Sequence, residues 1–416
     1  MLIAAVTSVS SAGYGQESLP DHREPLPDHE LSRIPVKERP LPGYEPIGYR
    51  LGSTLFHPQL TAGLLYDSNV FAAPSGGQGD LAYVLAPHLT ILSSTPRFSH
   101  KVDLGAEIYR FREFSSENRV DAHARYDGRA EIAQGLEVKT RFEAARRHEE
   151  RGDASTPRDA ATPIPYTDLR GEATLTKSID RYGVAVNASA RKLIYEDVNS
   201  IDGTLLDQRS RDGTIFSAYV KPFYEFSPGY RAFARLRANK RDYAATGTQD
   251  QDSRGYDAHA GLDFVMTPLI SGSVEAGYLN QIYENSLSPE TDGLSFVGRL
   301  TWLFTPLMTV KFVAERKVAE TITPGFGPRL DTSVGGQFDY ELLRNVIVSA
   351  GAKYTQEDFG NDGRKDNVTR AMAGVEYLMN RHLKLGARYE YLRRDSNDPE
   401  FKFDRHTVMF NATTQY

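Results

Sequence analysis

The sequence predicts an all-β fold, a transmembrane up-and-down antiparallel β-barrel of about eighteen strands that follows a Pro-rich N-terminal periplasmic tail. Three observations support this prediction. Apolar and polar residues alternate along segments that are mostly 12–17 residues long. These segments recur to the last residue, and the connections between them are alternately short and long. Such a pattern is typical of barrels whose apolar face meets lipid and whose polar face lines a wet interior.

The segment from Tyr230 to Tyr243, YRAFARLRANKRDY, shows the alternation clearly. Its even positions are apolar from Tyr230 to Ala238, and its odd positions are cationic or polar except Phe233. A strand explains this period of two because successive side chains point to opposite faces. Soluble strands are usually about 5–6 residues long, so a segment of this length favours a membrane barrel.

Eighteen segments share this alternation. They span residues 54–70, 80–94, 98–114, 118–132, 136–148, 165–178, 182–196, 211–225, 230–243, 254–266, 269–284, 292–304, 307–321, 330–341, 346–359, 367–379, 382–395 and 402–416. A soluble β-propeller would instead repeat four short strands every ~40–50 residues.

The connections indicate which way the barrel faces. Each even-numbered segment is followed by a tight turn, such as 95–97 or 227–229, whereas the loops at 149–164, 197–210 and 244–253 are longer and polar. Outer-membrane barrels place short turns in the periplasm and long loops outside the cell. We therefore expect an integral protein of the outer membrane of a Gram-negative bacterium, with both termini periplasmic.

Composition agrees with this prediction. Mean hydropathy is −0.47, and no apolar run reaches the ~18–20 residues of a membrane-spanning helix, but alternation hides a lipid face from such averages. The chain contains no Cys, which fits a location outside the cytoplasm without disulfides. The net charge of −6 is modest, and acids interrupt the basic residues, so we expect no nucleic-acid partner.

The chain divides into three parts. Residues 1–15 resemble the remnant of a signal peptide that lacks its charged start. Residues 16–50 are Pro-rich and charged, which predicts a periplasmic linker that could also dock a partner. Residues 51–416 form the predicted barrel.

The last segment predicts further contacts. It ends on an aromatic residue, Tyr416, and so resembles the signal that barrel-assembly machinery binds. Aromatic residues near strand ends, such as Tyr224, Phe226 and Tyr230, suit interfacial girdles. Outer-membrane lipids and lipopolysaccharide are the expected surroundings.

The start of the predicted barrel resembles a known family. Residues 44–53, YEPIGYRLGS, precede Pro58 and the run LYDSNVF at 65–71. These motifs resemble the opening of the putative β-barrel porin 2 family, and the rest of the chain agrees in its hairpin rhythm. The resemblance implies an outer-membrane pore and suggests polysaccharide export, because some members accompany exopolysaccharide gene clusters. It supplies no catalytic residues.

No motif predicts an enzyme. The sequence lacks His-Glu-x-x-His, Gly-x-Ser-x-Gly and a phosphate-binding Gly-rich loop. The run from Asp250 to Gly255 begins like a calcium loop, but Gly261 stands where a bidentate Glu is needed. The lumen-facing His123 and His259 are isolated in sequence, which favours a solvated or hydrogen-bonded role. We expect no catalytic residue, cofactor or metal.

Selectivity is expected to depend on cations that face the lumen. Because charge rings set selectivity in pores, we predict this role for Arg231, Arg235, Arg237, Arg241, Arg125, Arg129, Lys139 and Arg141. Alternatively, acids such as Asp257 and Asp263 pair with the arginines and only hold the wall together. Inward Phe233 and Tyr283 could stack on sugar rings or pack an inserted loop.

Several functions fit these patterns. Our first hypothesis is a conduit for export of an extracellular polysaccharide, delivered by periplasmic export proteins. The alternative within transport is a general diffusion porin. A structural or adhesion barrel with a closed lumen belongs to a different class, and a hydrolase lacks a nucleophile–base pair in the sequence. About sixteen strands or more leave an aqueous channel, unless a loop or the N-terminal tail folds into it.

Overall fold

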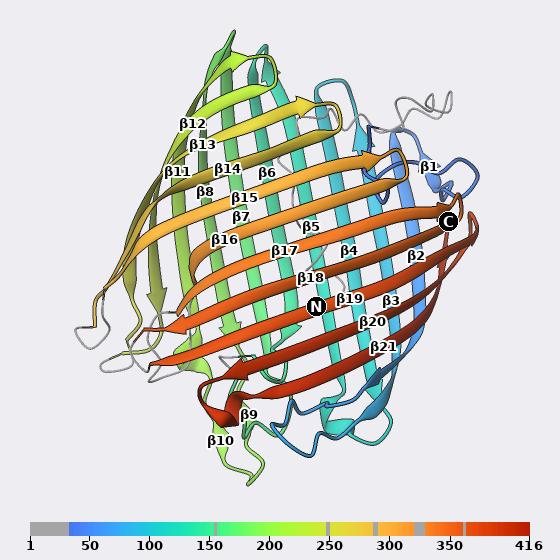
Figure 1. Cartoon of the computed structure of the whole chain (residues 1–416), viewed down its shortest axis with the longest axis vertical. Helices are drawn as coiled ribbons and strands as arrows, with labels where there is room; N and C mark the ends of the chain where they lie inside the picture. Colours follow the sequence, from blue (N-terminus) through green and yellow to red (C-terminus); the bar gives the residue numbers. More distant parts are fainter. Residues whose placement is uncertain (1–32, 154–155, 247–249, 286–289, 320–328, 361–362) are drawn as a thin grey trace.

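The computed structural model describes residues 33–153, 156–246, 250–285, 290–319, 329–360 and 363–416. They form one closed antiparallel barrel (Figure 1). The predicted signal-peptide remnant and the first part of the predicted linker lie outside the described residues. No helix among the described residues is long and apolar enough to cross a membrane.

Eighteen long strands make the barrel wall, as predicted. They are β2 (Thr54–Asp67), β3 (Asp80–Ser94), β4 (Phe98–Phe111), β5 (Arg119–Ala133), β6 (Leu136–His148), β7 (Pro165–Ile179), β8 (Tyr182–Tyr195), β11 (Gly213–Ser227), β12 (Tyr230–Tyr243), β13 (Ser253–Thr267), β14 (Ile270–Tyr283), β15 (Thr291–Thr305), β16 (Met308–Ala319), β17 (Arg329–Leu343), β18 (Val346–Phe359), β19 (Arg364–Asn380), β20 (Leu383–Ser396) and β21 (Phe403–Gln415).

The barrel closes where the first and last wall strands pair. β2 is hydrogen-bonded to β21 from Gln59↔Gln415 to Asp67↔Thr407. Where β21 ends, the short strand β1 (Tyr49–Leu51) pairs with the start of β2. Closure removes the free sheet edges, whose unpaired backbone groups could not be satisfied in lipid.

Strand β12 illustrates how alternation builds the wall. Leu236 points outward with 63% of its surface exposed, whereas Phe233 points inward and is 6% exposed. In the register with β13, Leu236 lies opposite Ala258 and Arg237 lies opposite Asp257. Apolar residues thus meet apolar ones on the outer face, and charged residues meet charged ones on the inner face.

The two mouths of the barrel differ. At the short-turn mouth, consecutive strands are joined by two or three residues, and at the long-loop mouth most connections are longer. Gly229, in one short turn, has a φ of +79°, and a Cβ there would lie 2.9 Å from the Val265 carbonyl oxygen, so glycine is favoured on both grounds. Long connections contain the small hairpin of β9 (Val198–Asn199) and β10 (Leu205–Leu206) and the 3₁₀ turns η1 (Ser115–Glu117), η2 (Arg209–Arg211) and η4 (Pro399–Phe401).

Aromatic side chains gather on the outer face near short turns. Tyr182 and Tyr224 stack with ring centroids 4.7 Å apart, and the exposed Phe226 lies beside Tyr230. Rings with an apolar body and a polar tip suit the boundary between hydrocarbon and headgroups.

Candidate functional site: the barrel lumen

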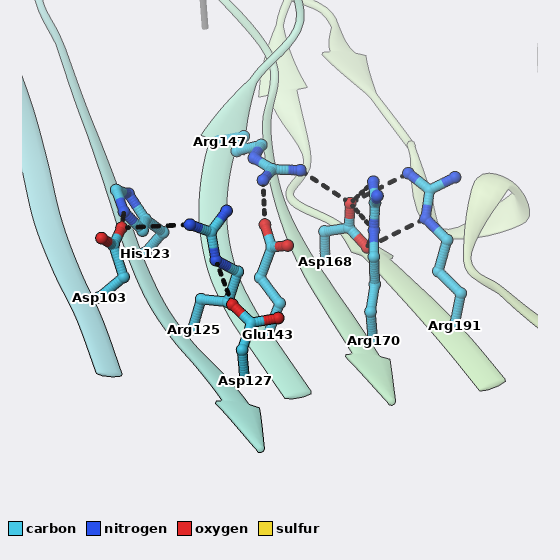
Figure 2. Close-up of polar contacts among 9 residues, drawn as sticks. All are labelled: Asp103, His123, Arg125, Asp127, Glu143, Arg147, Asp168, Arg170 and Arg191. Carbon is cyan, nitrogen blue, oxygen red and sulfur yellow. Dashed lines mark hydrogen bonds and ion pairs between the residues drawn. The ribbon is translucent and has the colours of Figure 1, made fainter. Parts of the chain in front are cut away.

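Neighbouring strands place charged side chains together on the inner wall (Figure 2). Asp168 on β7 is 1% exposed and is contacted by three guanidinium groups. Arg170 Nη2 lies 2.5 Å from it, Arg191 Nε 3.0 Å and Arg147 Nη1 3.1 Å. Arg147 also pairs with Glu143 on its own strand. The cations therefore outnumber the acids in this cluster, and Arg170 and Arg191 remain 42% and 36% exposed.

A second chain of contacts runs beside this cluster, from Asp103 on β4 to Asp127 on β5 (Figure 2), and continues to Arg141 on β6. Arg125 Nη2 lies 3.8 Å from Asp103 Oδ1, and its Nε lies 3.2 Å from Asp127 Oδ2. Arg141 Nε donates to the other oxygen of Asp127 at 2.5 Å. His123 shares Asp103 with Arg125.

The predicted cationic stripe of β12 is paired with acids. Arg235 Nη2 lies 3.4 Å from Asp257 Oδ1, its Nη1 lies 3.0 Å from Glu275 Oε1, and Arg237 also pairs with Asp257. Arg231 lies 3.6 Å from Glu225. Of the two acids predicted as partners, Asp257 pairs with Arg235 and Arg237, and Asp263 lies opposite Arg231 and interacts with it electrostatically.

The second predicted partner, Asp263, is bound by Lys221 Nζ at 3.1 Å. The same Lys221 Nζ lies 3.6 Å from the ring centroid of Phe233. A face of this ring is thereby occupied by an ammonium group, a favourable cation–π arrangement, and Phe233 is 6% exposed.

The remaining predicted residues also lie on the inner wall. Arg129 and Lys139 share Glu137, at 2.5 and 3.1 Å. Arg141 lies 3.9 Å from Glu172 in addition to Asp127. Arg241 is half-buried at the long-loop end of β12 and interacts with other groups. Each of the predicted cations other than Arg241 thus has an acid within 4.0 Å.

The loop of residues 149–164, called here the inward loop, is anchored inside the long-loop mouth; residues 154 and 155 lie outside its described part. Arg151 Nη2 donates to Glu117 Oε1 at 2.7 Å and Nε donates to Oε2 at 3.1 Å, and both residues are buried. Gly152 packs so closely that an added Cβ would lie 2.5 Å from Phe403 on β21. The loop starts from β6 and therefore reaches across several strands.

The inward loop also interacts with residues on the far side of the lumen. Arg158 lies 4.5 Å from the ring centroid of Phe401 in the connection between β20 and β21. Asp153 interacts electrostatically with Arg329 on β17 and Arg394 on β20. Since β17 lies nine strands around the wall from β6, the inward loop narrows the long-loop mouth.

Two acids at the start of the inward loop show how strongly it is docked. Burial raises the pKa of Glu149, although Arg211, with Nη1 3.1 Å from Oε2, favours its charged form. Burial also opposes ionisation of Glu150, but Arg405 and Arg370 outweigh it and lower the pKa. Both carboxyl groups are thus held among cations.

The short-turn mouth is narrowed by residues 33–48, called here the mouth segment. Val36 and Leu41 are buried against Ile347 on β18 and Leu378 on β19. The backbone N–H of Val36 donates to Thr309 Oγ1 on β16 at 2.9 Å. The described part of the predicted linker is therefore packed on the inner wall.

Ion pairs hold the same segment. Lys37 Nζ lies 3.2 Å from Asp339, and Arg39 Nη1 lies 3.5 Å from Glu341. Arg39, Asp339 and Glu341 are buried. Such pairs are strongly destabilised when one partner is removed, because the other charge is left uncompensated.

These features define an integral outer-membrane β-barrel with a porin-like lumen. The family model described as "Putative beta-barrel porin 2" matches residues 41–416, and the chain belongs to this family. No curated protein matches the sequence.

Solved structures of outer-membrane proteins are similar over most of the chain. OccAB4 of Acinetobacter baumannii is 11% identical with a TM-score of 0.45, over 91% of this chain and 100% of that one. OpdQ of Pseudomonas aeruginosa is 10% identical with a TM-score of 0.45, over 87% and 98%. OpdK of the same organism, in a structure with vanillate, is 10% identical with a TM-score of 0.44, over 87% and 99%. At these identities and scores the likeness says nothing about cargo.

Proposed function

We propose that this protein is a passive diffusion channel that conducts small polar solutes and prefers anions, with both termini in the periplasm. The observation that carries the proposal is the cluster around Asp168. Its carboxylate is 1% exposed, whereas Arg170 and Arg191 present 42% and 36% of their side-chain surface. A mobile ion in the lumen therefore meets guanidinium groups before it meets the acid that neutralises them.

The size and lining of the barrel support conduction. About 16–18 strands leave an aqueous channel, and this wall has eighteen. Mouths narrowed by the inward loop and the mouth segment favour small solutes over large ones. The short turns beside the mouth segment support its periplasmic placement.

Polysaccharide export, the first hypothesis from the sequence, gains no support. The family match names no cargo. Phe233, which could stack on sugar rings or pack an inserted loop, has Lys221 over a face of its ring. The general diffusion porin, the alternative from the sequence, fits the narrowed charged lumen better.

The experiment is a reversal-potential measurement on the purified protein in planar bilayers under a potassium chloride gradient. We expect an open channel that prefers chloride. Changing Arg170 and Arg191 together to Gln is expected to move the reversal potential toward cation preference, and Asp168→Asn to move it further toward anions. Arg235 and Arg237 changed to Glu test the predicted stripe of β12 in the same way.

Arg146→Gln is the matched control, because Arg146 lies on the outer face of β6 and is half exposed. It should leave selectivity unchanged. Unchanged selectivity in the Arg170 and Arg191 variant would refute the proposed basis of anion preference. A folded protein without conductance would refute the channel and favour the closed adhesion barrel.

A further inference from the structure

Three side chains on neighbouring strands converge at one point of the inner wall. His88 Nε2 on β3 lies 3.1 Å from Asp103 Oδ2 on β4, and His123 Nε2 on β5 lies 3.0 Å from Asp103 Oδ1. The three ligand atoms all lie within 4.8 Å of one another. Figure 2 shows His123 leaning over Asp103. Among the described residues, this is the one group of three with such spacing.

The register explains why these residues meet. His88 and His123 both lie opposite Gly105, one from each neighbouring strand. Gly105 leaves the space between them open, since a Cβ there would lie 2.5 Å from His123 Cε1. Both imidazoles can therefore turn toward Asp103, two residues along β4 on the same face. Asp103 is fixed in turn by Thr90, whose hydroxyl donates to Oδ2 at 3.2 Å.

This spacing matches the edges of a metal coordination polyhedron. With zinc–ligand bonds of ~2.0–2.1 Å, neighbouring ligands of a tetrahedral ion lie about 3.3 Å apart. The two imidazole–carboxylate separations, 3.1 and 3.0 Å, are close to that value. Two neutral imidazoles and one carboxylate form a donor set suited to zinc and its neighbours rather than to magnesium or calcium. The half-exposed histidines leave water in the lumen free to complete the coordination.

We propose that His88, Asp103 and His123 bind a divalent transition-metal ion of the zinc class that enters from the lumen. The site requires a water-filled lumen but not ion conduction through it. Its three ligands lie on rigid wall strands, so they need only small side-chain movements to bind the ion.

The positive charge of Arg125 opposes binding of the metal ion. Its Nη2 lies 3.8 Å from Asp103 Oδ1, while Asp127 holds its Nε at 3.2 Å. A guanidinium at this distance lowers the affinity for a cation. Removing its charge should therefore strengthen metal binding, whereas a site that only held the wall together would show no such gain.

The test is isothermal titration calorimetry of zinc chloride into the folded, metal-free full-length protein in detergent micelles, with magnesium chloride as the comparison ion. We expect one zinc ion per barrel at this site and no comparable binding of magnesium. His88→Ala and His123→Ala should each weaken zinc binding by more than the roughly 10–100-fold typical of losing an outer partner. Arg125→Gln should tighten it several-fold.

His100→Ala is the matched control, since this exposed histidine lies on β4 itself and contacts Tyr126 on the outer face. It should bind zinc as the parent does. Heat-dependent gel migration verifies that each variant is folded. Asp103→Asn removes the carboxylate ligand while keeping the shape of the side chain. The proposal is overturned if the parent protein binds no zinc, or if folded His88 and His123 variants bind it as tightly as the parent. Neither outcome depends on whether the channel conducts.

Discussion

Replacing Glu117 with Gln is expected to release the inward loop. Glu117 is 1% exposed and receives two hydrogen bonds from Arg151, at 2.7 and 3.1 Å. A third bond, from Arg151 Nη1 to the carbonyl of Ala160 at 2.6 Å, ties the same guanidinium to the far part of the loop. The substitution preserves the shape of the side chain but leaves the Arg151 charge buried without its counter-charge.

The free-energy cost of this substitution follows from the burial of the ion pair. Removing one partner of a buried ion pair costs about 3–5 kcal/mol, which corresponds to roughly two to four powers of ten in the ratio of docked to undocked loop. Single-channel recording in planar bilayers should then show larger or strongly fluctuating conductance, because the loop that narrows the long-loop mouth leaves its place.

Glu196→Gln is the control for this substitution. Arg146 and Glu196 form the same two-pronged contact, at 3.0 and 2.8 Å, but both side chains are about half exposed. Exposed pairs contribute only about 0–1 kcal/mol, so this variant should conduct like the parent. If Glu117→Gln also leaves conductance and its noise unchanged, the inward loop does not limit the current.

Two further predictions concern the short-turn mouth and the orientation of the barrel. Arg39→Glu should raise conductance by expelling the mouth segment from beside Glu341, and adding Glu341→Arg should restore the parent value; failure of the double variant to do so would contradict this pairing. Ile201, 77% exposed in the long connection after β8, becomes a unique labelling site as Ile201→Cys because the chain has no Cys. A membrane-impermeant maleimide should label it on intact cells, and labelling only after the outer membrane is opened would reverse the proposed orientation.

The strands could be predicted from the sequence because one face of each must be apolar. The alternation along 230–243 predicts β12 with the same bounds, and the segment 254–266 predicts β13 to within one residue at each end. Membrane burial imposes this period of two on every wall strand, so a local pattern suffices. The family resemblance, drawn from residues 44–71, is confirmed over residues 41–416.

The lumen could be predicted only in part, because its contacts depend on register. The inward faces of β5, β6 and β12 follow from alternation, but the three cations around Asp168 come from β6, β7 and β8 and meet only once those strands are aligned. His88, Asp103 and His123 are likewise separated in sequence and appear isolated before pairing. The inward loop and the mouth segment escape prediction for another reason, since their Pro-rich or polar sequences contain no period that identifies a docking wall.

The mouth segment has a consequence for the order of folding. Val36 contacts Thr309, 273 residues further along the chain, and its other partners lie on β18 and β19. Contacts of such long sequence separation form late, because the intervening chain must first be ordered. The cylinder must therefore assemble around an unfilled interior, and a segment that is synthesised before every wall strand takes its place among the last. A barrel arrested before that step would be a wider pore than the finished protein.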